Sequence, residues 1–248
     1  MKFLLQIKNG EIADVEVFEA RELIRRSSYY MEYLLIDLNK LKITKEDYSE
    51  WIPIGDLIFV QEWLKKYKGV DKMPPIEVPI VLRKEKYLGR SYDIVSFEDL
   101  DLQGNKFIKD VDKLKQFSYI GNLDNLDKND KSIFISQNYL ISNIVDIVAE
   151  YRCFVSDMDI KAIQFYDGDC TVFPNISLLR EMVGIYYLDQ NRPKSYTMDI
   201  AVLKNGRTII LEVHPVTSVG TYGYSDKDLL YMYKEGIQYY INCRKQDK

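Results

Sequence analysis

Residues 199–214 read Asp199-Ile-Ala-Val-Leu-Lys-Asn-Gly-Arg-Thr-Ile-Ile-Leu-Glu212-Val-His214 and predict a β-hairpin. An alternating apolar strand, a Lys-Asn-Gly-Arg turn and a second strand follow one another. Asp199 is expected at the start of the first strand, and Glu212 and His214 near the end of the second. Residues two apart on a strand face the same way, so all three side chains can converge at one mouth of the sheet. Two carboxylates there suit Mg²⁺, which shares its other positions with water and phosphates. The alternative is a surface hairpin with ordinary strand-edge charges.

The composition is that of a globular protein. The chain has 248 residues, of which 46% are hydrophobic and 29% charged, and its net charge is −4. A negative net charge argues against nucleic acid as the partner. Cys153, Cys170 and Cys243 have neither zinc-site spacing nor a disulfide framework, which favours the reducing cytoplasm. No window approaches the roughly 18 apolar residues of a membrane-spanning helix.

Residues 1–78 predict a small α/β lobe. We expect a strand over 2–7, a turn at Asn9-Gly10 and helical spacing over 20–36, of which 29–36 can also be extended. Residues 51–60 predict a short strand, a turn and the start of a helix that reaches Lys66. The three prolines within 73–79 prevent a helix, so this segment is interpreted as a linker.

Residues 79–248 predict an α+β domain with mainly antiparallel sheets. The expected elements are a capped helix at 96–100, strands at 106–109, 132–141, 149–155 and 160–166, a helix at 177–187, the hairpin, and an amphipathic helix at 226–244. Strands outnumber helices and are joined by short turns, which argues against a doubly wound parallel sheet.

Several polar side chains near strand ends are candidates for binding a nucleotide. Lys109 ends an apolar strand and can reach a phosphate as a point charge, and Lys115 follows six residues later. The chain lacks both a Walker motif and Gly-x-Gly-x-x-Gly, so any nucleotide site has another architecture. Main-chain groups of 137–140 can pair with an adenine edge. The alternative for each is an ordinary strand end.

Glu150 and Arg152 share one face of a predicted strand. The planar fork of Arg suits phosphate or carboxylate, and the alternative is a cross-strand ion pair. His214, the single histidine, can bind a metal or accept a proton as neutral imidazole, or it is structural. Residues 220–223 form either a loop that closes on substrate or a plain helix-entry loop.

Taken in order, these motifs resemble an ATP-grasp domain. They are Phe107-Ile-Lys109-Asp, Ser136-Gln-Asn-Tyr-Leu140, Glu150-Tyr-Arg152-Cys-Phe-Val155, and Asp199 with Glu212-Val-His214. The chain is most similar to the divergent R2K clade, defined by two arginines and a lysine. Residues 51–60 and 213–223 resemble that group's preceding and C-terminal signatures, so the similarity spans about residues 50–240.

The resemblance implies ATP held between two α+β subdomains, at about 90–140 and 141–248. The implied nucleotide-binding residues are Lys109, Lys115, Gln137, Asn138, Tyr139, Leu140 and Glu150. The implied catalytic residues are Lys109, Arg152 and, as the second arginine, Arg90. The implied Mg²⁺ ligands are Asp199, Glu212 and His214. His214 stands where the family usually has Asn, and residues 116–122, the expected lid, contain a single glycine, Gly121.

Two functions of different classes follow from the resemblance. One is an ATP- and Mg²⁺-dependent carboxylate–amine or carboxylate–thiol ligase that acts through an acylphosphate, with a small molecule, peptide or protein end as substrate. The other is a nucleotide-binding regulatory protein that no longer turns over, which His214 and the glycine-poor lid favour. A third alternative, from composition alone, is an α+β binding protein without nucleotide.

Overall fold

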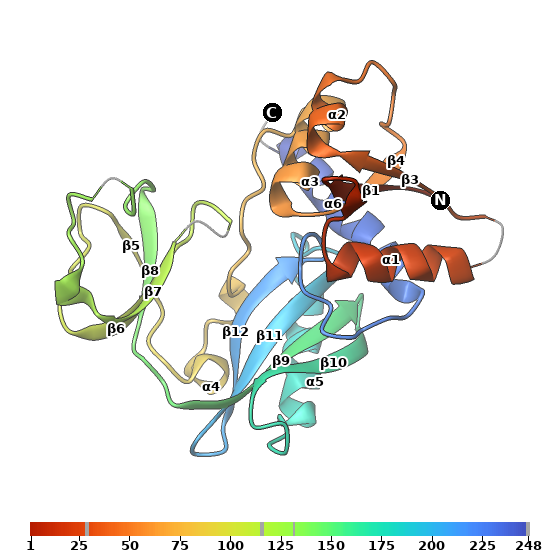
Figure 1. The fold of residues 1–248 in the computed structure, drawn as a ribbon. Helices are drawn as coiled ribbons and strands as arrows, with labels where there is room; N and C mark the ends of the chain where they lie inside the picture. Colours follow the sequence, from red (N-terminus) through yellow and green to blue (C-terminus); the bar gives the residue numbers. More distant parts are fainter. Residues whose placement is uncertain (28–29, 115–116, 131, 247–248) are drawn as a thin grey trace.

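The computed structural model describes residues 1–27, 30–114, 117–130 and 132–246, with three four-stranded sheets (Figure 1). In the first sheet, β1 (Lys2–Lys8) pairs in parallel with β3 (Glu32–Asp37) and β4 (Trp51–Ile54), and antiparallel with β2 (Glu11–Ile12). The apolar centre of β1, Phe3 to Leu5, is fully buried. All four strands of this mostly parallel sheet lie within residues 1–78, for which an α/β lobe is predicted.

Helices flank the first sheet. Asp14 caps α1 (Val15–Arg26) by accepting a hydrogen bond from the Val17 N–H. The further helices are α2 (Leu38–Ile43) and α3 (Leu57–Trp63), which a π-helical turn, η1 (Leu64–Lys68), extends. The helix predicted over 20–36 is wrong in its bounds. It begins at Val15 and ends at Arg26. The alternative, that 29–36 is extended, is confirmed over 32–36, which belong to the strand that pairs with β1.

The second sheet has the order β10-β9-β11-β12 and is antiparallel throughout. Its strands are β9 (Ile147–Ser156), β10 (Asp159–Gly168), β11 (Ser195–Leu203) and β12 (Thr208–Pro215). Helix α5 (Ile176–Tyr187) packs on one face through Leu179, Met182 and Tyr186. The predicted hairpin is confirmed, although Asp199 lies in the middle of β11 rather than at its start.

The third sheet has the order β5-β8-β6-β7 and is also antiparallel. Its strands are β5 (Asp93–Ser96), β6 (Asn105–Asp110), β7 (Ser118–Asn122) and β8 (Asn138–Ser142). Ile108 and Tyr139 are fully buried in a core of their own with Phe134. The capped helix predicted at 96–100 is wrong. Ser96 ends β5, and its hydroxyl bonds Asp99 in a turn.

The third sheet lies to one side of the second (Figure 1). Short helices η2 (Ile80–Leu82) and α4 (Glu85–Leu88) precede β5, and η3 (Leu123–Asn125) follows β7. Residues 143–146 lead from β8 directly into β9. Two strands of the third sheet, β6 and β7, line one cavity together with β12, the edge strand of the second sheet that carries Glu212.

The C-terminal helix α6 (Asp228–Gln246) returns to the first sheet. Leu229, Tyr233 and Ile237 share one buried core with α1, α3 and β1. Within the described ranges, no helix is both long and apolar enough to cross a membrane. A domain boundary after residue 78 stays a prediction.

Candidate active site

A cavity of about 730 Å³ lies between the third sheet and the second. Its apolar wall includes Phe107 on β6, Ile120 on β7 and Leu211 on β12. Its acidic and basic side chains come from all sides of the cavity and are Glu77, Arg90, Lys109, Asp110, Glu150, Arg152, Asp199, Glu212 and His214. A mostly apolar hollow with a few convergent charges is typical of a small-molecule site.

Arg152 and Asp199 form a two-pronged ion pair across the second sheet. They stand opposite each other in the register of β9 and β11. Arg152 Nε donates to Asp199 Oδ1 at 2.8 Å, and Nη2 donates to Oδ2 at 2.7 Å. The third nitrogen, Nη1, donates to the Gly220 carbonyl at 3.1 Å, which ties the loop after β12 to this pair. Burial opposes the charge, but Asp199 raises the pKa of the Arg152 guanidinium.

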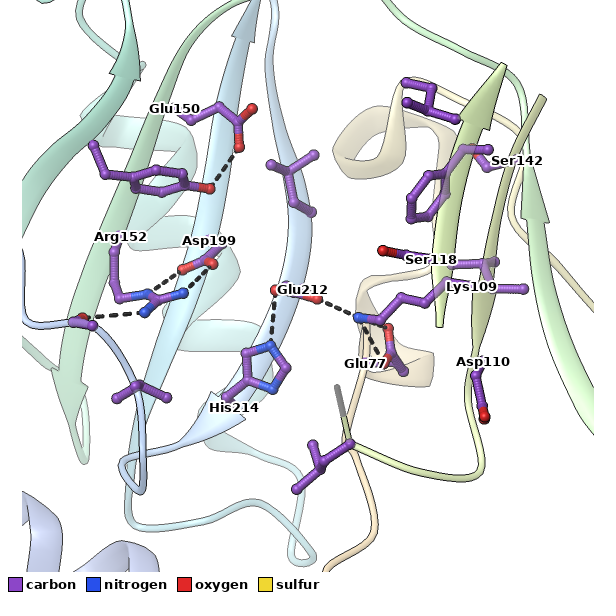
Figure 2. A pocket seen from close by; sticks show the side chains of 18 of the residues that line it. Glu77, Lys109, Asp110, Ser118, Ser142, Glu150, Arg152, Asp199, Glu212 and His214 are labelled. Carbon is purple, nitrogen blue, oxygen red and sulfur yellow. Dashed lines mark hydrogen bonds and ion pairs between the residues drawn. The ribbon is translucent and has the colours of Figure 1, made fainter. Parts of the chain in front are cut away.

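Lys109 links the third sheet to the second. Figure 2 shows its side chain reaching from β6 towards Glu212 on β12 and Glu77 before η2. Nζ lies 2.9 Å from Glu77 Oε1 and 3.0 Å from Oε2, and it donates to Glu212 Oε2. Burial alone would lower the pKa of Lys109, but the two carboxylates raise it. Lys109 is therefore a fixed positive charge in the cavity.

Glu212 is the acceptor shared by Lys109 and His214. His214 Nε2 lies 2.9 Å from Glu212 Oε1. Burial alone would raise the pKa of the Glu212 carboxyl, but His214 and Lys109 bring it well below its ordinary value. Glu212 is therefore ionised at neutral pH and can serve as an oxygen ligand.

Arg90 brings an unsatisfied donor to the same cavity. Its Nη2 donates to the Leu211 carbonyl at 3.1 Å, while its buried Nε has no hydrogen-bond partner among the described residues. Burial lowers the pKa of this guanidinium, and the nearby carboxylates Glu212 and Glu77 counteract this effect. A buried cationic N–H without an acceptor fits an anionic ligand, such as a phosphate or carboxylate.

Aromatic side chains wall the cavity beside Arg152. Tyr166 and Tyr222 are stacked, with ring centroids 4.8 Å apart, and the Arg152 guanidinium lies 5.0 Å from the Tyr222 ring. The Tyr166 hydroxyl donates to Glu150 Oε2 at 2.6 Å. Burial raises the pKa of the Glu150 carboxyl, although this hydrogen bond opposes the shift.

The segment 137–140, predicted to bind adenine, does not form the cavity wall as expected. The main-chain N–H groups of Gln137 and Asn138 both donate to Asp112 Oδ2, at 2.8 and 2.9 Å, and Tyr139 is fully buried in the core of the third sheet. Only Leu140 of this segment lines the cavity. The strand predicted over 132–141 in fact begins at Asn138, so its exit lies later in the chain. The wall there consists of Ser142, Asn143, Ile144, Val145 and Ile147.

The other predicted site residues can be placed directly. The structure gathers Arg90, Lys109, Leu140, Glu150, Arg152, Asp199, Glu212 and His214 at the cavity. Lys115 lies outside the described residues. Sequence reasoning missed Glu77, because a single Glu between prolines in a linker carries no motif.

The carboxylates of the cavity are the candidate ligands for Mg²⁺. Within the described part of the chain, no three His, Cys, Asp or Glu side chains are grouped so as to hold a metal ion. Mg²⁺, however, is usually bound by one or two carboxylates, with the remaining positions taken by water and substrate phosphates. Asp199 and Glu212 are direct neighbours across β11 and β12 and both line the cavity, so they fit this arrangement. The role of His214 as a third ligand stays a prediction.

Comparison with known families agrees with this geometry. The model of the family described as ATP-grasp domain, R2K clade family 2, matches residues 87–232, which is more than half of the chain. The chain belongs to this ATP-grasp family. The match begins after residues 51–60, which were also expected to resemble the clade. A search of curated proteins finds no match.

Solved structures show the ATP-grasp fold. D-alanine–D-alanine ligase from Bacillus anthracis, complexed with ATP, superposes with a TM-score of 0.57 at 13% identity and covers 100% of this chain and 99% of its own. D-cycloserine synthetase DcsG superposes with a TM-score of 0.52 at 11% identity, covering 97% of this chain and 100% of its own. The predicted α+β class and ATP-grasp fold are thereby confirmed. At sequence identities this low, structural similarity supports the fold alone.

Proposed function

We propose that this ATP-grasp protein is an ATP- and Mg²⁺-dependent ligase. It joins a carboxylate to an amine or thiol through an acylphosphate. One observation carries the proposal: Lys109 from one sheet meets Glu212 from the other inside a cavity that also holds the Arg152–Asp199 pair. A cation on one side of the cavity and carboxylates on the other can bind the phosphates of a nucleoside triphosphate and its metal ion, respectively.

The chemistry needs charge stabilisation rather than a side-chain nucleophile. An oxygen of the substrate carboxylate attacks the γ-phosphorus of ATP and ADP leaves, and the amine then attacks the acyl carbon and releases phosphate. Lys109 and Arg90 would neutralise negative charge on the phosphates, and Arg152 would face the transferred group or the acyl intermediate. Asp199 and Glu212 would hold Mg²⁺, which supplies further positive charge at the phosphates.

The base of ATP is assigned to the wall made by Leu140, residues 142–145 and Ile147. The Ile144 side chain is 40% exposed and lines the cavity, so it is free to contact a bound ring. The acceptor is a small molecule or a peptide, and the cytoplasm, which supplies ATP, is the expected location. The proposed domains are residues 1–78 and an ATP-grasp domain over 79–248.

A second candidate function is a nucleotide-binding regulator without turnover. It is favoured by the ion pairs of the two predicted metal ligands. Asp199 is paired with Arg152, and Glu212 with Lys109 and His214, so a metal ion must compete with these partners.

Release of ADP and phosphate separates the two. The purified protein is incubated with ATP, Mg²⁺ and mixed pools of carboxylates and amines. The ligase predicts ADP formation that needs both pools. Binding of ATP in calorimetry without any ADP formation in any pool would favour the regulator.

A further inference from the structure

Glu77 occupies an unusual backbone conformation beside the predicted metal carboxylate. Its φ is +57°, in the left-handed region that residues other than Gly, Asn and Asp rarely adopt. Its carbonyl accepts from the Val213 N–H at 3.0 Å, so the linker forms a single β-bridge to β12. Val213 lies between Glu212 and His214. The linker is therefore fixed to the strand that carries both predicted metal ligands.

This backbone arrangement aims the Glu77 carboxylate at Lys109. Nζ lies within 3.0 Å of both carboxylate oxygens. Glu77 Oε1 is buried and accepts no hydrogen bond among the described residues, so the charge of Lys109 is its main compensation. A buried carboxylate without a cation is costly, which makes Glu77 and Lys109 mutually dependent.

Lys109 thus has two carboxylate partners, and they differ in exposure. Both line the cavity, but the Glu212 side chain is 27% exposed and that of Glu77 only 5%. A metal arriving with phosphates can reach Glu212 and would draw it from Lys109. Glu77 is too deeply buried to follow, so it remains as the partner of the lysine.

We propose that Glu77 is a positioning residue that holds Lys109 in place for the phosphates of ATP when Glu212 turns to the metal. The inference rests on the proposed function, because it assigns Lys109 to phosphate. It adds a residue outside the matched family region, in the linker that joins the first lobe to the site.

A double-mutant cycle tests the coupling. Calorimetry with ATP and Mg²⁺ compares the wild type with Glu77→Gln, Lys109→Met and the double variant, and Glu181→Gln is the matched control. Glu181 pairs with Lys86 at 2.6 Å, on the surface and outside the cavity. Gln keeps the shape of Glu77 and leaves its main-chain bridge intact.

Loss of the Glu77 charge should weaken ATP binding roughly tenfold, as for other groups that orient a ligand-binding side chain. The control should bind as the wild type does. In the Lys109→Met background, Glu77→Gln should cause no further loss, because Glu77 acts through the lysine. The proposal is overturned if Glu77→Gln weakens ATP binding as much in the Lys109→Met background as in the wild type, or if Glu77→Gln alone does not weaken it. A loss of ATP affinity in Lys109→Met alone still supports the proposed function.

A second measurement needs no nucleotide and no Lys109 variant. The apo wild type and Glu77→Gln are acylated with an amine-reactive ester, and the labelling of Lys109 is followed by peptide mass spectrometry. Lys109 should be labelled several-fold faster in Glu77→Gln, with the rate at Lys86 unchanged. Equal rates at Lys109 would show that Glu77 does not hold it. If the wild type binds no ATP, the proposed function and the positioning role both fail, whatever the labelling shows.

Discussion

Asp199 lies directly opposite Glu212 in the register of β11 and β12, yet the two carboxylates bind different cations. Asp199 is held by Arg152 from the neighbouring strand, and Glu212 by Lys109 from the facing sheet. The two cations orient the adjacent carboxylates before a metal binds.

Removal of the Glu212 charge should abolish turnover while the fold survives. Glu212→Gln should lower Mg²⁺-dependent ADP release by about 100-fold or more, because a hard cation loses one of its two carboxylates. Lys109 keeps Glu77 as a partner, so the structure should persist. Steady-state ADP release and circular dichroism measure the two effects, with Glu181→Gln as control. A normal rate with normal Mg²⁺ dependence would contradict the metal role.

The Arg152–Asp199 pair should matter for stability as well as for activity. Arg152→Met leaves a carboxylate that is 3% exposed without its cation, which costs about 3–5 kcal/mol in such pairs. Arg152→Met/Asp199→Asn should cost less than the sum of the single variants. Urea denaturation of the four proteins gives the coupling. Strict additivity would mean that the pair does not act as a unit.

The contribution of Glu212 to the free energy of unfolding should depend on pH. Its pKa is lower in the folded protein than the roughly 4.3 of an unfolded chain, so the unfolded state binds the proton more tightly. The free energy of unfolding of the wild type should therefore exceed that of Glu212→Gln at pH 5, and this difference should shrink as the pH falls further. Urea unfolding between pH 7 and pH 3, with chelator present, measures it. A flat margin down to pH 3 would oppose the assignment.

Two helical glycines should respond in opposite directions. A Cβ at Gly236 in α6 would lie 2.4 Å from the Val216 carbonyl oxygen, whereas one at Gly184 in α5 meets nothing within 4 Å. Gly236→Ala should therefore destabilise by roughly 1–3 kcal/mol through overpacking. Gly184→Ala should stabilise by about 0.5–1 kcal/mol through helix propensity. Thermal unfolding checks both, and a stabilising Gly236→Ala would show that α6 does not pack closely against the loop after β12.

The position of the adenine wall can be tested by two substitutions. Ile144→Asp places a charge where we assign the base and should weaken ATP binding by roughly tenfold or more. Gln137→Pro, which removes a main-chain N–H of the segment first expected to bind adenine, should leave the affinity within about twofold, because that N–H is engaged by Asp112. The reverse pattern in calorimetry would restore the sequence-based assignment.

The sequence predicted the parts of the site that depend on strand periodicity. Asp199, Glu212 and His214 followed from the alternation of a hairpin, and Arg152 from its place in an apolar strand. Residues 137–139 do not line the cavity, because the loop before β8 reads like a strand and is engaged by the carboxylate of Asp112, 25 residues away in the chain. Adenine binding by this segment stays a prediction. The position of Glu77 in the site could not be predicted from the sequence, because it depends on a left-handed backbone conformation and a β-bridge to β12. The surroundings of both the segment 137–140 and Glu77 are set by contacts with residues far away in the sequence.

The most direct test is calorimetric titration of ATP with Mg²⁺ into the wild type and into Lys109→Met. The account predicts that the wild type binds one ATP per chain and that Lys109→Met loses at least about tenfold in affinity, since a charge-assisted contact to phosphate is removed. Circular dichroism confirms that the variant is folded. Absence of binding by the wild type, or equal affinity of the two folded proteins, would contradict the claim that ATP binds between Lys109 and Glu212.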